Sequence, residues 1–234
     1  MSRNSPIPRP RTASKRVRTR SNLNDDDRSF DDSRLRSVYD GFAKFYWMDS
    51  LLSDRLGRAS VLRSWLMAQA RGRVLDVACG QGENFAHLTA ADAIVAVDLS
   101  PAMIEHAAKR ASKSAVPVET RVMSATELGF PDQNFDTVVS ALATCTYPDP
   151  NAALREMARV LKPDGELLLL EHGRSSAKWL ATFQDRRSDR HYRNAGCRWN
   201  QDVEDLARAA DLEIIETRRK TLGVFVAMRA KVPR

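Results

Sequence analysis

The sequence predicts an α/β fold with a mostly parallel sheet, and three observations lead to this prediction. From Arg71 onward, short and strongly apolar runs alternate with amphipathic stretches. The first apolar run ends in a glycine-rich loop, which is typical of strand-to-helix turns in open α/β sheets. The length of 234 residues suits one such domain with extra segments at its ends.

Seven segments have the composition of β-strands, because each is a short apolar run bounded by polar or turn residues. They span residues 74–78, 93–97, 116–122, 135–140, 166–171, 212–218 and 221–228. Helical stretches separate the early strands, which predicts parallel pairing with helices on both faces of the sheet. The last two strands follow each other closely, so we expect an antiparallel addition at the end of the sheet.

Amphipathic stretches predict helices at residues 83–88, 101–112, 151–161 and 202–210. Ser100 before Pro101 starts the second of these well, because a serine caps the first amides and proline suits the first helical turn. Residues 172–200 are different, since they are polar, aromatic and basic without a clean period. We interpret this stretch as a substrate insert.

The N-terminal part divides into a tail and a helical cap. Residues 1–30 begin with a basic, Ser- and Pro-rich stretch that has few large apolar side chains, which predicts disorder. A solvated tail, a transit peptide, a contact with anionic membranes and a nucleic-acid arm are all compatible with its charge. Residues 31–70 carry apolar side chains at helical spacing, so we expect them to cap the main domain, residues 71–234.

Composition argues against several classes of protein. No run of about 18 apolar residues is present, so no membrane span is expected, and no apolar signal segment stands near the start. The three cysteines, Cys79, Cys145 and Cys197, are far apart and show neither a metal-binding spacing nor a disulfide framework. We therefore expect a reducing compartment and no metal site.

The glycine loop after the first strand carries the strongest functional signal. Gly80 and Gly82 let the backbone approach a ligand closely. Asp98 ends the second strand, about 20 residues beyond the loop, where an acid binds ribose hydroxyls. Phe85 occupies the third glycine position of a dinucleotide fingerprint, and no Walker lysine follows, so a nucleotide pyrophosphate is disfavoured. Asp76 suits a cationic group, and S-adenosylmethionine offers both an ammonium and a sulfonium.

Motifs along the chain resemble a known family. Four stretches stand in a consistent order: Val74–Gly82, Val97–Met103, Leu128–Asp136 and Arg159–Gly165. Together they are similar to the motifs of class I S-adenosylmethionine-dependent methyltransferases of the ubiquinone/menaquinone-biosynthesis type. Three shorter stretches, Val38–Ala43, Leu170–Ser175 and Gly196–Asn200, resemble the Oms-type subgroup, which includes membrane-associated thiol and lipid methyltransferases. The resemblance covers Tyr39 to about Met228.

The resemblance implies both a fold and a set of cofactor-binding residues. The fold is a Rossmann-like, doubly wound sheet of seven strands, mostly parallel, with an antiparallel last strand and an N-terminal helical cap. Asp76 and Gly80 would lie against the methionine part of the cofactor, and Asp98 would bind both ribose hydroxyls. The full predicted set is Tyr39, Asp76, Ala78, Gly80, Gly82, Asp98, Leu99, Met103, Ser124, Ala125 and Ala141.

Some of these positions depart from the family or have a second interpretation. Ser124 stands where the family often has an acid that contacts the adenine amino group, and Ala78 replaces a frequent glycine. Asp98 also suits the N-terminus of a helix, where an acid is favourable. Met103 also suits plain core packing. Tyr39 and Tyr46 either close over the cofactor or pack the cap helix.

Methyl transfer is an in-line displacement at a cationic sulfonium, so the enzyme mainly positions two reactants and excludes water. A general base is needed only if the nucleophile arrives protonated. His172 follows the fifth strand and would face the ligand crevice, so we predict it as the base; the alternative is that it orders the next loop. Further candidates follow the fourth strand, namely Thr144, Cys145 and Tyr147.

We expect methyl transfer from S-adenosylmethionine to a small-molecule or lipid acceptor of the quinol, thiol or phospholipid-amine class. The insert would wall the acceptor site with His191, Tyr192, Arg193, Arg198 and Trp199. A non-catalytic module with this fold is the alternative, and a nucleic-acid methyltransferase is disfavoured because Thr146–Asp149 lacks the amine-methylation motif. The basic tail allows peripheral membrane contact. We expect a cytoplasmic location, with the mitochondrion as the alternative that the Oms-type resemblance favours.

Overall fold

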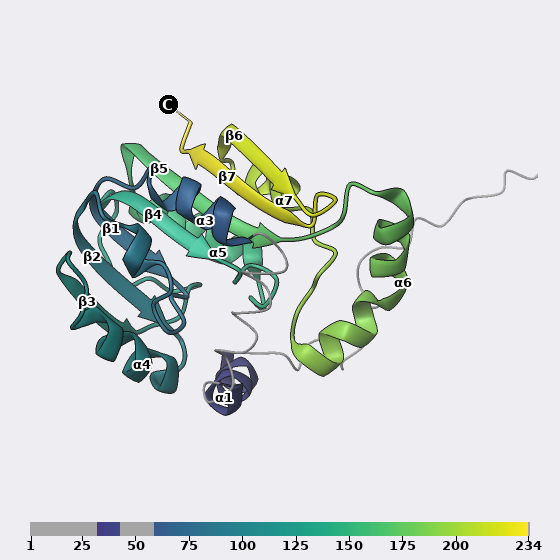
Figure 1. Ribbon diagram of the computed structural model, residues 1–234, viewed down its shortest axis with the longest axis horizontal. Coiled ribbons are helices and arrows are strands. Elements are labelled where there is room, and N and C mark those ends of the chain that lie inside the picture. Colours follow the sequence, from purple (N-terminus) through teal and green to yellow (C-terminus); the bar gives the residue numbers. More distant parts are fainter. Residues whose placement is uncertain (1–31, 43–58, 234) are drawn as a thin grey trace, which may run out of the picture.

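The computed structural model describes residues 32–42 and 59–233, and in this part of the chain a seven-stranded sheet forms the centre (Figure 1). The strands are β1 (Gly72–Val77), β2 (Ala91–Asp98), β3 (Val118–Val122), β4 (Phe135–Ala141), β5 (Leu161–His172), β6 (Glu213–Lys220) and β7 (Phe225–Lys231). Their order across the sheet is β3-β2-β1-β4-β5-β7-β6. The first five strands pair in parallel, whereas β7 runs antiparallel to β5 and β6. The predicted sheet, mostly parallel with an antiparallel last strand, is confirmed.

Helices cover both faces of the sheet. The helices α3 (Ala59–Met67) and α4 (Pro101–Ala111) pack on one face, and α5 (Pro150–Val160) and α7 (Val203–Ala209) pack on the other. The strand β1 shows how the sequence achieves this, because successive side chains of a strand point to opposite faces. Val74 belongs to the core with α3 and α4, while Leu75 belongs to the core with α5 and α7.

The main helices begin where the local chemistry predicts. Ser100 caps α4, since its Oγ accepts a hydrogen bond from the Met103 amide at 3.2 Å. Asp149 caps α5 through the Ala152 amide, and Asp202 caps α7 in the same way. Each side chain satisfies an amide that has no partner within its own helix. The predicted helices at 101–112, 151–161 and 202–210 are therefore confirmed, with ends close to the expected ones.

The predicted helix at residues 83–88 is wrong. The structure has only a single 3-10 turn there, η2 (Phe85–His87). The connection between β1 and β2 is short, and Phe85 turns its buried ring back against the α-carbon of Gly82. A continuing α-helix would carry this ring away from the loop. The close contact fixes the shape of the glycine loop instead.

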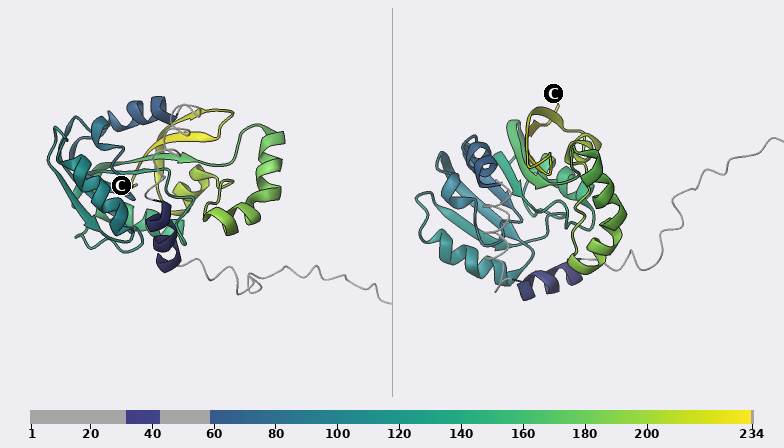
Figure 2. Two further views of the ribbon diagram at one scale, coloured as in Figure 1. Left: turned by 60° about the horizontal axis from the view of Figure 1, so that its bottom comes forward. Right: turned by 45° about the vertical axis from the view of Figure 1, so that its right-hand side comes forward.

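The helical cap differs in part from the prediction. The helix α1 (Asp32–Phe42) lies against α4 at the carboxyl edge of the sheet and takes the cap position (Figures 1 and 2). The helix α3 is instead part of the sheet's covering layer, because Leu62 and Leu66 are buried in the core against the strands. The predicted disordered tail and Tyr46 lie outside the described residues.

The segment that we interpreted as an insert contains a long helix, α6 (Lys178–Ala195), which the sequence did not predict. It stands beside the sheet rather than on either face, and its C-terminal end approaches α1 (Figures 1 and 2). Gly196 ends it in a left-handed conformation with φ of 65°, as glycine often does after a helix. Within the described residues no helix combines the length and the apolarity needed to cross a bilayer.

Candidate functional site

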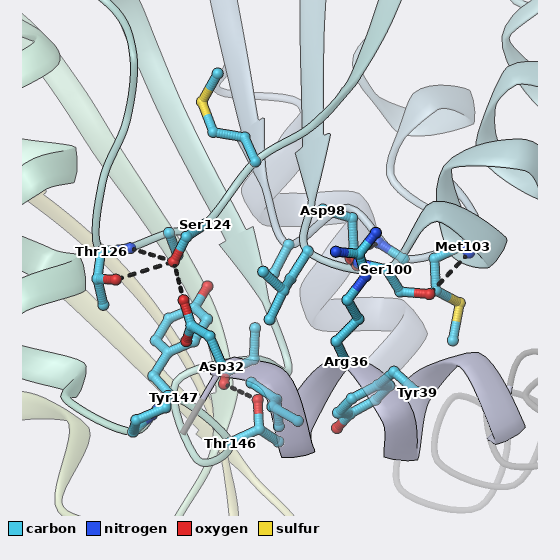
Figure 3. Close-up of a pocket in the computed structure, with 18 of the residues that line it drawn as sticks. Asp32, Arg36, Tyr39, Asp98, Ser100, Met103, Ser124, Thr126, Thr146 and Tyr147 are labelled. Carbon is cyan, nitrogen blue, oxygen red and sulfur yellow. Dashed lines mark hydrogen bonds between the residues drawn. The ribbon is translucent and has the colours of Figure 1, made fainter. Parts of the chain in front are cut away.

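A pocket of about 720 Å³, partly open to solvent, lies at the carboxyl ends of β1, β2 and β4, and α1 forms one of its sides (Figure 3). Open α/β sheets bind ligands in this crevice. Nine of the predicted residues line it, namely Tyr39, Ala78, Gly80, Asp98, Leu99, Met103, Ser124, Ala125 and Ala141. Asp76, Gly82 and His172 are not among the lining residues.

Asp98 joins two loops at the base of the pocket. Its Oδ2 accepts a hydrogen bond from the Gly80 amide at 2.9 Å, and its Oδ1 accepts one from the Ser100 amide at 2.9 Å. Burial raises the pKa of this carboxyl, and the two amide bonds act against that rise. A carboxylate has about four acceptor positions, so two positions are left for hydroxyl donors of a ligand. Asp98 can therefore hold the N-terminus of α4 and accept hydrogen bonds from ribose hydroxyls at the same time.

The glycine loop has an unusual backbone that its sequence explains. Ala78, Gly80 and Gly82 all have positive φ, with values of 54°, 55° and 84°. A Cβ atom on Gly82 would lie 2.4 Å from Cε2 of Phe85, so only glycine fits there. Ala78 adopts the left-handed conformation at a cost of about 1–2 kcal/mol. This is the position at which the resemblance indicated a frequent glycine.

Asp76 is fully buried beneath this loop. Its Oδ1 accepts a hydrogen bond from Nδ2 of Asn84 at 3.0 Å, and Arg63 in turn donates to Oδ1 of Asn84. Its Oδ2 has no hydrogen-bond partner in the described structure. Burial raises the pKa of Asp76 to about 7. A cationic donor would stabilise such a carboxyl strongly, but Asp76 does not line the pocket, so its contact with the ammonium group of S-adenosylmethionine stays a prediction.

The far end of the pocket contains a carboxylate that the sequence did not reveal. Oγ of Ser124 donates a hydrogen bond to Oδ2 of Asp32 at 2.7 Å and also lies 2.9 Å from Oγ1 of Thr126 (Figure 3). Asp32 is the first residue of α1. The cap helix thereby supplies an acid next to Ser124, the position where the resemblance indicated an acid. No local sequence signal could reveal a contact across 92 positions.

The helix α1 is fixed over the pocket by its own contacts. Leu35 is buried against Tyr192 of α6, and Tyr39 and Leu99 pack beside this pair. Oγ of Ser100 also donates a hydrogen bond to Asp40. Arg36 lines the pocket as well and is the single cationic side chain among its described lining residues. The sequence did not single out Arg36, since one arginine on an amphipathic helix usually marks only a solvated face.

The end of β4 and the loop after it form another wall of the pocket. Thr146 and Tyr147 line it, and Oγ1 of Thr146 donates to the Ala143 carbonyl at 2.7 Å. Burial raises the pKa of Tyr147 well above its ordinary value, so this phenol stays protonated at neutral pH. Among the described lining residues there is no histidine, cysteine or lysine.

Glu171 fixes the loop that forms this wall. Its carboxyl is fully buried and accepts hydrogen bonds from the Ala143 and Thr144 amides, with the shortest distance 3.1 Å. Burial raises its pKa to about 7, while the charge of His172 acts against that rise. The sequence alone does not reveal this role, because an acid inside an apolar strand carries no signal of its partner.

His172 lies among thiols instead of lining the pocket. Its Nε2 is 3.2 Å from Sγ of Cys145 and 3.4 Å from Sγ of Cys197. Hydrogen bonds from Cys145 and, to a smaller degree, His172 lower the pKa of Cys197 to about 4. The pKa of Cys145 is raised by the same partner and by burial. The role of His172 as a general base stays a prediction.

The other insert residues form a surface next to α1. The ring of His191 stacks on Trp199 at 4.2 Å, and the guanidinium of Arg198 lies 3.7 Å from the centre of the Tyr192 ring. Arg193 is exposed. None of these side chains is among the described pocket lining, so their role as an acceptor wall also stays a prediction.

Comparison with known proteins agrees with this geometry. Residues 75–169 match the family described as the methyltransferase domain. The phosphatidylethanolamine N-methyltransferase of Cereibacter sphaeroides is 32% identical over 163 residues, which cover 68% of this chain and 79% of that protein.

The chain belongs to the class I S-adenosylmethionine-dependent methyltransferases. Another relative in this family is the protein of Saccharomyces cerevisiae named Methyltransferase OMS1, mitochondrial, which is 32% identical over 188 residues. These residues cover 72% of this chain but only 40% of the yeast protein.

The sheet is also that of solved methyltransferases. One chain of the complex between the Haloferax volcanii Trm112 methyltransferase activator and a methyltransferase superposes with a TM-score of 0.67. The match covers 84% of this chain and 98% of that one at 20% identity, so it concerns the fold alone. The family assignment and the fold are thus both established, and the acceptor of the methyl group follows from neither.

Proposed function

We propose that the protein transfers the methyl group of S-adenosylmethionine to a small-molecule or lipid acceptor of the quinol, thiol or phospholipid-amine class. The observation that carries this proposal is the pocket at the carboxyl ends of β1, β2 and β4. It combines the carboxylates of Asp32 and Asp98 with apolar surface from Leu99 and Met103. A nucleoside with a positive charge needs this combination, because its hydroxyls and cations need acceptors and its base needs an apolar slot.

The residues divide the cofactor among them as follows. Asp98 receives the ribose hydroxyls while it holds the Gly80 and Ser100 amides. Leu99 and Met103 pack on the adenine, and the pair of Ser124 and Asp32 accepts the hydrogens of its amino group. Asp76 lies buried beneath the glycine loop, and its second carboxylate oxygen has no hydrogen-bond partner in the described structure. The negative charge of this carboxylate favours the cationic methionine end of the cofactor. The cofactor supplies an electrophilic methyl group when bound.

Positioning and exclusion of water then account for catalysis. In-line displacement at a sulfonium gains most from holding the nucleophile in line at contact distance. The helix α1, which is packed on Tyr192 and hydrogen-bonded to Ser100, covers the pocket and removes water that would compete with the acceptor. His172 remains our candidate base for acceptors that arrive protonated. The pocket itself needs no base for a thiolate or a neutral amine.

The α6 helix supports an amphipathic acceptor. Trp179 and Phe183 lie one helical turn apart and are 69% and 44% exposed. The helix contains five basic residues and two acidic ones, and its exposed cations include Arg187, stacked on the Phe183 ring at 5.0 Å. Exposed aromatic side chains among cations are typical of a helix that lies on an anionic lipid surface. We infer peripheral membrane contact through this helix, with the basic tail as a second contact.

The location that we propose is the cytoplasm, with the mitochondrion as the alternative. The name of the yeast relative favours the mitochondrion, and the chain is 32% identical to it. Fractionation of cells that produce the untagged full-length protein distinguishes the two. A signal in washed mitochondria would replace the cytoplasmic assignment.

Formation of S-adenosylhomocysteine tests the proposed reaction. The full-length protein is incubated with methyl-labelled S-adenosylmethionine and, separately, a ubiquinol analogue, an alkyl thiol, phosphatidylethanolamine vesicles, RNA and DNA. We expect label in one of the first three products and none in nucleic acid. Cofactor binding without transfer to any acceptor would favour the non-catalytic alternative. Transfer to nucleic acid with a steep salt dependence would contradict the acceptor class.

A further inference from the structure

Three sulfur and nitrogen donors meet beside the pocket although they are far apart in the sequence. Cys145 comes from the loop between β4 and α5, His172 ends β5, and Cys197 follows α6. Both sulfur atoms lie close to the same ring nitrogen, Nε2 of His172, at 3.2 and 3.4 Å. All three donor atoms lie within 4.8 Å of one another. The spacing of these residues along the chain does not predict a metal site, because the fold alone brings the donors together.

The arrangement has the dimensions of a tetrahedral metal site. Thiolate and imidazole ligands at their usual bond lengths around Zn²⁺ are separated from each other by about 3.5–3.8 Å. The observed sulfur–nitrogen distances are only a few tenths of an ångström shorter, so coordination needs small side-chain shifts. Cys145 is buried, while Cys197 and His172 are half-buried, which leaves a path for an ion to enter.

We propose that Cys145, His172 and Cys197 bind one thiophilic divalent cation, and that Zn²⁺ is the ion that suits this donor set best. Two thiolates and one neutral imidazole favour Zn²⁺ over Mg²⁺ or Ca²⁺, which prefer oxygen ligands. Binding leaves the thiolate charges balanced by the ion and releases the protons still held by the thiols. Three protein ligands leave the fourth tetrahedral position to water or to an external donor.

The position of the site gives the ion a structural effect on the pocket. It would tie the end of α6 to the loop after β4, where the Arg198 amide already donates to the Cys145 carbonyl at 2.8 Å. The neighbour of Cys145, Thr146, lines the pocket, and Tyr192 of α6 packs against α1. Coordination through Nε2 would also remove His172 as a general base. Binding of the ion is compatible with methyl transfer by positioning alone, and it excludes only the base role that we propose for His172.

Metal analysis of the untagged full-length protein tests the proposal without an activity assay. The protein is stripped with a chelator under reducing conditions, dialysed against Zn²⁺ or Co²⁺, and freed of unbound ion. We expect one ion per chain, a melting temperature about 5–10 °C higher than that of the stripped protein, and the absorption of tetrahedral Co²⁺ with thiolate charge transfer. Far less than one ion per chain, or octahedral Co²⁺ without thiolate charge transfer, would overturn the site.

Variants locate the ligands. Cys197→Ser and His172→Gln should each lose most of the bound ion and the rise in melting temperature, whereas Cys79→Ser, the remaining cysteine, and His106→Gln should retain both. Retention of the ion by Cys197→Ser would overturn the assignment. Mass spectrometry of the untreated protein covers the case in which variants misfold. A Cys145–Cys197 disulfide there would replace the metal site by a redox pair.

Discussion

The cofactor pocket and the exposed surface of α6 beside it differ in how firmly the fold prepares them. On the cofactor side, the Asp98 carboxylate, the Gly80 amide and the Ser100 amide are already joined by hydrogen bonds of 2.9 Å, and Asp76 is buried below them. On the α6 side, Trp179 and Phe183 are exposed and the charges face solvent.

This difference suits the two reactants of a methyl transfer. One fixed cofactor rewards a rigid, preorganised set of donors and acceptors, because binding then loses little conformational freedom. An amphipathic acceptor that arrives from a lipid surface needs a face that tolerates a range of contacts. The comparison therefore predicts that changes on the cofactor side alter stability and cofactor affinity together, while changes at the exposed Trp179 and Phe183 of α6 leave cofactor affinity unchanged.

The largest effect should come from the buried carboxyl of Asp76. Its pKa is about 7 in the folded protein and near 3.8 in the unfolded chain, so the folded state keeps the proton longer. Its contribution to stability is full below about pH 4 and is lost as pH rises through about 7. Relative to Asp76→Asn, the wild type should lose about 3–4 kcal/mol between pH 4 and pH 8.

Urea unfolding over this pH range measures the effect. The exposed Asp92 on β2 serves as the matched control, since Asp92→Asn should keep the wild-type slope. Equal pH slopes for the wild type and Asp76→Asn would mean that burial does not raise the pKa of Asp76. The buried carboxyl would then no longer support the binding of a cationic ligand group.

Substitution of Gly82 should have the next largest effect. Gly82→Ala places a methyl group 2.4 Å from the Phe85 ring at a φ of 84°, so it should lower the free energy of unfolding by about 2–4 kcal/mol. Gly41→Ala, at a helical position with open space around it, should leave stability unchanged or slightly higher. If thermal and urea unfolding rank the two variants equally, the glycine loop is not rigid in the way we describe.

Removal of the acid that the cap helix supplies, Asp32, should have a smaller effect, and this effect is on cofactor affinity. Asp32→Ala removes the acceptor of the Ser124 hydroxyl and should weaken S-adenosylmethionine binding about 3–10-fold in calorimetry. The exposed Ser37 on the same helix gives the control Ser37→Ala, for which we expect wild-type affinity. Wild-type affinity in Asp32→Ala as well would assign adenine recognition to the sheet alone.

On α6, Trp179→Ala and Phe183→Ala should leave cofactor affinity unchanged but reduce flotation with vesicles that contain anionic phospholipid. Leu222→Ala changes another exposed apolar side chain and should float like the wild type. Weaker cofactor binding in the two α6 variants would remove the distinction between the cofactor pocket and the α6 surface.

The cofactor pocket and helix α6 also differ in how much of each could be predicted from the sequence. Asp98 ends β2, and Gly80 and Ser100 lie within three residues of a strand end. The order of apolar runs places those ends along one edge of the sheet. The helix α6 escaped prediction because polar side chains stand between the apolar ones on its buried face. Gln184 is buried and bonded to the Ser175 amide and to the Gly173 and Trp199 carbonyls, and Ser188 is buried against Asn200.

A buried face of this kind leaves no apolar period to detect. The contact between Asp32 and Ser124 and the meeting of Cys145, His172 and Cys197 depend on tertiary structure, which brings together positions that share no local pattern. Nine of the eleven cofactor-binding residues predicted from the sequence therefore line the pocket, and their roles there stay predictions. The sequence described the α6 surface only by its composition.

Calorimetric titration of the full-length protein with S-adenosylmethionine tests the central claim most directly. The wild type and the exposed-acid control Asp92→Ala should each bind one cofactor per chain with equal affinity. Asp98→Ala, which loses the ribose acceptor, should bind about 5–150-fold more weakly. A dissociation constant on the order of 1 mM already marks weak binding. If folded wild-type protein binds no cofactor at a concentration on the order of 1 mM, the assignment of this pocket is contradicted.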